Sequence, residues 1–86
     1  MEIEITSEAK KDLDYWKKSG NVKVLKRIRD LIESIQETPF EGIGKPEPLK
    51  FELSGKWSRR INQSHRLVYT VTDSTIYISS LAGHYD

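Results

Sequence analysis

A small set of side chains outside the expected helices combines proton transfer with phosphate binding: Glu47, Lys50, Arg59, Arg60, Arg66, His84 and Tyr85. A carboxylate accepts a proton and an imidazole donates one, while guanidinium groups bind phosphate oxygens and stay charged. These groups suit RNA cleavage without a metal, in which a base activates the ribose 2′-OH, an acid protonates the departing 5′ oxygen and cations stabilise the phosphate. DNA lacks that nucleophile.

Other chemistries find no support in the sequence. There is no Ser-His-Asp arrangement, no His/carboxylate cluster at metal-ligand spacing, and no Gly-rich loop that opens a helix. We therefore expect neither a metal nor a cofactor. His65 stands beside a turn and is expected to be structural. Glu47 between two prolines is alternatively an ordinary loop acid, and Lys50 a solvated strand residue.

Composition indicates one small domain over residues 1–86, with 36% apolar and 31% charged residues and no cysteine. The lack of cysteine excludes disulfides and favours a reducing cytoplasm. The beginning of the chain, MEIEITSEAK, has no long apolar run, so we expect neither a signal peptide nor a membrane partner.

The charge is unevenly distributed, although the net charge is only +1. Residues 45–66 contain six basic and two acidic residues, whereas the rest of the chain contains eight basic and eleven acidic ones. A local cationic excess of this kind indicates a patch for a phosphate chain or an acidic partner. A solvated loop with extra lysines is the alternative.

Hydrophobic periodicity and turn residues predict an α+β fold. We expect a strand, an antiparallel helix hairpin and then a four-stranded antiparallel meander, so that the helices cover one face of a mostly antiparallel sheet. The strands are expected at Glu2–Thr6, Leu49–Leu53, Trp57–Ile61, Arg66–Thr72 and Thr75–Leu81, and the helices at Glu8–Lys18 and Val22–Glu37.

The other sheet face is then free for a site. With a three-residue turn at positions 62–64, Arg60 and Arg66 lie opposite one another on one face, where like charges cost up to about 1 kcal/mol. A phosphate bound between them would relieve that repulsion. The alternative is that Arg59 or Arg60 pairs with a surface acid.

The stretch PFEGIGKPEPLKFELSGKWSRRINQSHRLVY, followed by a terminal HY, resembles the YoeB toxins of the RelE/ParE superfamily of bacterial toxin–antitoxin systems. The resemblance extends over the full length. It implies a RelE/YoeB-like fold and a ribosome-dependent mRNA endoribonuclease that cuts mRNA in the ribosomal A site. It also implies a homodimer, held inactive by an antitoxin of the YefM/Phd type.

Residue roles follow from the same resemblance. Glu47 in KPEPLK is similar to the general base and His84 to the general acid. Arg66 in HRLVY is similar to the residue that stabilises the transition-state phosphate, and Tyr85 to the one that orients the scissile nucleotide. Lys50 and Arg60 resemble supporting phosphate contacts, and Arg59 belongs to the same candidate phosphate-binding group.

One position departs from the family pattern. A Lys or Arg usually stands shortly before the final HY, whereas this chain has Ala82 in LAGHY. Two alternatives to a fully active nuclease therefore stay open. One is a catalytically weakened RNA-binding variant, and the other is a ParE-like toxin that binds DNA gyrase and needs no acid or base.

Overall fold

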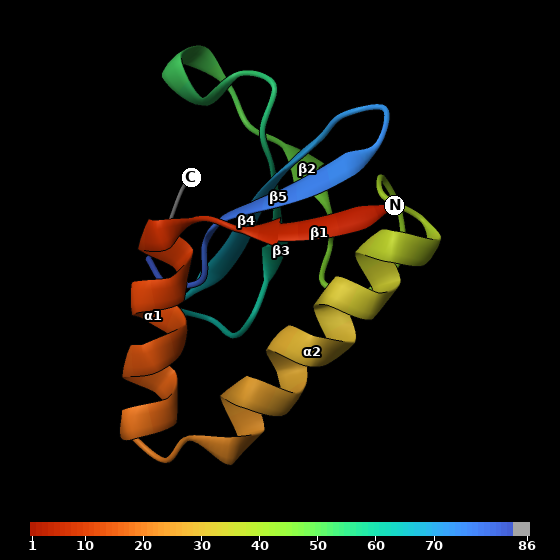
Figure 1. Cartoon of the computed structure of the whole chain (residues 1–86). Coiled ribbons are helices and arrows are strands. Elements are labelled where there is room, and N and C mark those ends of the chain that lie inside the picture. Colours follow the sequence, from red (N-terminus) through yellow and green to blue (C-terminus); the bar gives the residue numbers. More distant parts are fainter. Residues whose placement is uncertain (84–86) are drawn as a thin grey trace.

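Two helices lie on one side of a five-stranded sheet (Figure 1). The computed structural model describes residues 1–83. Its elements, in chain order, are β1 (Glu2–Ile5), α1 (Ser7–Lys18), α2 (Val22–Glu37), β2 (Glu47–Pro48), a 3₁₀ helix (Phe51–Leu53), β3 (Trp57–Arg60), β4 (Arg66–Val71) and β5 (Thr75–Ser80). This arrangement confirms the predicted α+β class, with element ends within one residue of expectation everywhere except near β2.

The strand order is β1-β5-β4-β3-β2. The β3, β4 and β5 strands form the predicted antiparallel meander, and β1 joins β5 in parallel, with Ile3 opposite Ile76. The first strand therefore pairs with the last one, and Figure 1 shows them side by side. Because this pairing joins the two ends of the chain, the sheet is complete only when residues 75–80 are in place.

Both helices begin at side-chain caps and turn an apolar face to the sheet. Thr6 Oγ1 accepts from the Ala9 N–H at 3.3 Å, and Asn21 Oδ1 accepts from the Val24 N–H at 3.1 Å. The Leu31 and Ile35 side chains of α2 are fully buried. Burial of such a side chain stabilises the fold by about 1.5–3 kcal/mol. Neither described helix has the length and apolarity that a membrane span requires.

The expected strand at Leu49–Leu53 is wrong. Strand pairing with β3 covers only Glu47 and Pro48, and residues 51–53 form a 3₁₀ helix. The reason is the backbone of Phe51, which has a φ of +58° and therefore leaves the extended conformation. Pro48 also lacks an N–H to continue the ladder. Lys50 consequently lies in the short link between β2 and the 3₁₀ helix.

Candidate functional site

The sheet face opposite the helices brings several of the predicted site residues together. Along this face Glu47 pairs with Ser58, and Ser58 pairs with Val68 on β4. Arg60 pairs with Arg66 one step further along, which confirms the predicted register. Glu47 and β4 are separated by two strand spacings, about 10 Å. A carboxylate and two guanidinium groups thus share one face of three adjacent strands.

The two arginines of this face differ in exposure. Arg60 is exposed at the end of β3, whereas Arg66 is only 5% exposed and interacts with other groups of the protein. Directly opposed like charges cost up to about 1 kcal/mol. The charges of the two opposed arginines favour an anion at this position. Glu47 and Lys50 are both exposed.

The prediction that Arg59 binds phosphate is wrong, because its side chain lies in the interior and is 0% exposed. Its Nε donates to the Tyr69 hydroxyl at 3.2 Å, and its Nη1 donates to Ser34 Oγ at 2.7 Å. Further donations reach the carbonyl oxygens of Ile43, Thr38 and Glu41. The guanidinium therefore connects β3 to α2 and to the loop after it. The alternation in WSRRI already places Arg59 on the same side as Trp57, a signal that the sequence interpretation did not use.

The loop that leads to Glu47 is held close to the sheet. The Arg60 N–H donates to the Gly44 carbonyl oxygen at 2.7 Å. Gly44 has a φ of +84°, and a Cβ there would lie 2.6 Å from Leu31 Cδ2. Only glycine allows this approach. Gly44 and the Arg59 guanidinium thus determine where the chain enters β2, and hence where Glu47 stands.

One ionisable group of the interior has a shifted pKa. Burial raises the pKa of the Tyr69 phenol, and the hydrogen bond and charge of Arg59 oppose that rise without cancelling it. The Tyr69 hydroxyl in turn donates to the Pro39 carbonyl oxygen at 2.7 Å. Tyr69 is therefore a neutral donor that helps to hold the loop after α2.

The chain end is anchored as far as it is described. The Arg66 N–H donates to the Gly83 carbonyl oxygen at 2.9 Å, and the Gly83 N–H donates to His65 Nδ1 at 3.0 Å. His84 and Tyr85, the predicted acid and aromatic contact, lie outside the described residues. Gly83, which directly precedes His84, is thus bonded to the backbone of Arg66.

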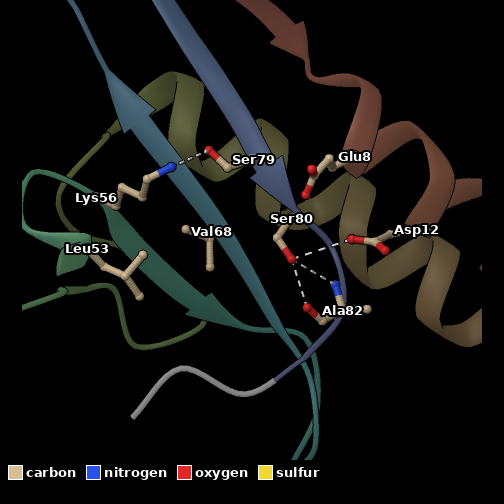
Figure 2. A pocket seen from close by; sticks show the side chains of 8 residues that line it. All are labelled: Glu8, Asp12, Leu53, Lys56, Val68, Ser79, Ser80 and Ala82. Atoms are coloured by element: carbon tan, nitrogen blue, oxygen red, sulfur yellow. Dashed lines mark hydrogen bonds between the residues drawn. The ribbon is translucent and has the colours of Figure 1, made fainter.

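A pocket of about 280 Å³ lies beside this chain end (Figure 2). Glu8 and Asp12 of α1 line one side of it, and Lys56 lines the opposite side with its Nζ 3.3 Å from Ser79 Oγ. Ala82 also lines the pocket. The departure from the family pattern therefore falls next to two carboxylates. Among residues 1–83, no three His, Asp or Glu side chains gather closely enough to hold a metal ion.

Known proteins resemble this chain over nearly its whole length. The Toxin YoeB of Escherichia coli (strain K12) is 47% identical over 85 residues, which cover 99% of this chain and 100% of the relative. The Toxin YoeB of Streptomyces coelicolor is 51% identical with the same coverage. Distant structures such as Escherichia coli YafQ, at 18% identity and a TM-score of 0.81, share the fold.

Two solved structures are similar in both sequence and fold. A YoeB/ParE toxin from Agrobacterium tumefaciens is 38% identical, with a TM-score of 0.94 and coverage of 99% of this chain and 100% of that one. A YoeB dimer from Staphylococcus aureus is 45% identical, with a TM-score of 0.90 and coverage of 99% and 98%. Residues 5–85 match the sequence profile of the YoeB-like toxins. The chain therefore belongs to the YoeB-like toxins of bacterial type II toxin–antitoxin systems.

Proposed function

We propose that this toxin is a ribosome-dependent endoribonuclease that cuts mRNA in the ribosomal A site without a metal. The observation that carries the proposal is the shared sheet face, on which Glu47 lies within two strands of the Arg60–Arg66 pair. A carboxylate beside two opposed cations suits a phosphate whose neighbouring hydroxyl must lose a proton. Inhibition of translation follows from cutting the message.

The proposed reaction is an attack of the ribose 2′ oxygen on the adjacent phosphorus. Glu47 takes the proton from the 2′-OH as the new O–P bond forms, and Arg66 stabilises the added negative charge. The bond from phosphorus to the 5′ oxygen breaks, and His84 protonates that oxygen. Tyr85 orients the scissile nucleotide, while Lys50 and Arg60 bind flanking phosphates. The product carries a 2′,3′-cyclic phosphate.

The ribosome supplies what this small site lacks. Two proton-transfer groups and a few cations offer little readout of sequence, and nothing in this reaction scheme forces free RNA into an in-line geometry. Correct positioning of reacting groups is worth about 7–11 kcal/mol of the barrier. A message held by the ribosome arrives with that geometry already established.

Relatives suggest the partners. One structure from Staphylococcus aureus is a YoeB–YefM complex, 46% identical to this chain, and another is a YoeB dimer. We propose that this toxin likewise forms a homodimer and binds a YefM/Phd-type antitoxin, and that it acts in the cytoplasm, where the bacterial ribosome and mRNA are.

The test is cleavage of mRNA on translating ribosomes by Glu47→Gln, with Glu52→Gln as the matched control. Both carboxylates are exposed, and Glu52 lies on the 3₁₀ helix away from the paired strands. Loss of the general base should reduce the cleavage rate by about 10²–10⁴-fold, while the control cuts as the wild type does. Wild-type cleavage by Glu47→Gln would contradict the role of the base. Equal cleavage of free mRNA would contradict ribosome dependence.

A gyrase-binding toxin is the second candidate, favoured by the ParE name of the Agrobacterium relative. Pulse labelling after induction separates the two, since a nuclease stops protein synthesis first and a gyrase binder stops DNA synthesis first. The third candidate is a catalytically weakened RNA-binding variant. It predicts that Ala82→Lys cuts ribosome-bound mRNA faster than the wild type does.

A further inference from the structure

Two side chains of α1 hold the backbone of Leu81, near the end of the described chain. Asp12 Oδ2 accepts from the Leu81 N–H at 2.9 Å, and Trp16 Nε1 donates to the Leu81 carbonyl oxygen at 2.9 Å. Leu81 itself is 0% exposed. Both polar groups of this residue are therefore satisfied by a helix more than sixty positions earlier in the sequence. The segment from Leu81 to Gly83 therefore begins at a backbone position that α1 holds.

His65 extends this anchoring to Gly83. Its Nδ1 accepts from the Gly83 N–H at 3.0 Å, and its ring packs edge-to-face against Trp16 at 4.9 Å and 85°. An accepting Nδ1 carries no proton, so the imidazole in this arrangement is the neutral tautomer with its proton on Nε2. The contact with Trp16 ties the ring to the same helix that holds Leu81.

Gly83 is thus bonded on both sides of its Cα. The N–H that His65 accepts belongs to the peptide group before the Cα, and the carbonyl oxygen that accepts from the Arg66 N–H belongs to the peptide group after it. Because a peptide group is planar, a hydrogen bond to each of the two groups restrains both backbone torsions of Gly83. Gly83 has a φ of +94° and no side chain to restrict its backbone. Without these hydrogen bonds it would sample many backbone conformations.

We infer that His65 is a positioning residue for the reaction: its acceptor nitrogen sets the direction in which the chain leaves Gly83 toward His84 and Tyr85. This inference rests on the proposed function, since it gives His65 a purpose only if those two residues act on RNA. In this role His65 acts through the backbone, by accepting the Gly83 N–H.

Two variants separate the acceptor from the ring. His65→Phe keeps an aromatic ring against Trp16 but has no acceptor, whereas His65→Asn places an amide oxygen near the position of Nδ1 but has no ring. Single-turnover cleavage of ribosome-bound mRNA gives the rate at saturating toxin and the half-saturating concentration. Amide hydrogen exchange at Gly83, followed by NMR on the free toxin, reports the hydrogen bond directly.

We expect His65→Phe to lose about 10²-fold in the saturated rate, the cost of misplacing a catalytic group by about 1 Å. The half-saturating concentration should change by less than about threefold, because the proposed phosphate contacts of Lys50 and Arg60 are unchanged. Gly83 exchange should accelerate in His65→Phe. In His65→Asn both the slow exchange and most of the lost rate should return. If the ring had a purely structural role, His65→Asn would instead cut more slowly than His65→Phe.

Three results would overturn the inference. They are cleavage by His65→Phe at the wild-type rate, a change confined to the half-saturating concentration, and restored Gly83 exchange in His65→Asn without recovery of rate. In all three the wild type is active, so the proposed function stands. A wild type that does not cut mRNA on ribosomes would instead overturn the proposed function, and with it this role of His65.

Discussion

Arg59 and Arg60 are consecutive residues of one strand, and they lie in opposite environments. The Arg59 side chain is 0% exposed on the helix-covered face and donates five hydrogen bonds to neighbouring groups. Arg60 is exposed on the open face, opposite Arg66. Composition alone therefore does not identify a phosphate-binding arginine. The strand face decides whether the guanidinium connects parts of the protein or is available to a ligand.

The two faces of the sheet also differ in exposure over their whole extent. The covered face contributes Leu67, Tyr69, Ile76 and Ile78 to the core, all 0% exposed. The open face carries Glu47, Arg60 and the 39% exposed Tyr77. Changes on the covered face should therefore alter stability, and changes on the open face should alter binding and catalysis.

The largest effect is expected for Arg59→Met. Removing the guanidinium takes one donor away from each of five acceptors: the Tyr69 hydroxyl, Ser34 Oγ and three loop carbonyls. The free energy of unfolding, measured with urea, should fall by about 3–5 kcal/mol. Arg60→Met is the matched control and should change it by less than about 0.5 kcal/mol. Equal effects at the two positions would contradict the division between the faces.

A smaller loss of stability is expected for Tyr69→Phe, which removes the hydroxyl that donates to Pro39 and accepts from Arg59. The free energy of unfolding should fall by about 1–2 kcal/mol at neutral pH. Tyr77→Phe, on the open face, serves as the control and should leave stability nearly unchanged.

The difference in stability between the wild type and Tyr69→Phe should depend on pH with a defined sign. Burial raises the pKa of Tyr69 above its ordinary value of 10.0, so the folded state holds the phenolic proton more tightly than the unfolded state does. This stabilisation is complete below pH 10.0 and is lost as the pH rises through the folded-state pKa. Urea midpoints from pH 8 to 11 should therefore fall more steeply in the wild type than in Tyr69→Phe. Identical profiles would show that the phenol is not protonated preferentially in the folded state.

The smallest change is expected for Arg60→Met in binding. If Arg60 contacts a phosphate, its loss should weaken ribosome or RNA binding and reduce the slope of log K against log[salt] by about one unit. Arg29→Met removes an exposed cation from α2 and should leave the slope unchanged. A similar reduction in both variants would indicate a general effect of net charge.

Much of the local structure was predictable from the sequence because it depends on near neighbours. The apolar stripe from Val24 to Ile35 and the cap at Asn21 define α2, and turn residues define the β3–β4–β5 meander. The expected strand at 49–53 failed because Phe51 adopts a positive φ, which no propensity predicts for an aromatic residue. Within the site, the Arg60–Arg66 register followed from the turn length alone.

Local sequence thus specifies the secondary-structure elements and the alternation that separates Arg59 from Arg60. Long-range packing specifies which sheet face the helices cover and that β1 pairs in parallel with β5. It also specifies that Asp12, Trp16 and His65 hold residues 81–83. The physical reason is the distance along the sequence between the residues that interact. Helix caps and strand alternation are set within a few residues, whereas these contacts depend on loop closure and packing across most of the chain.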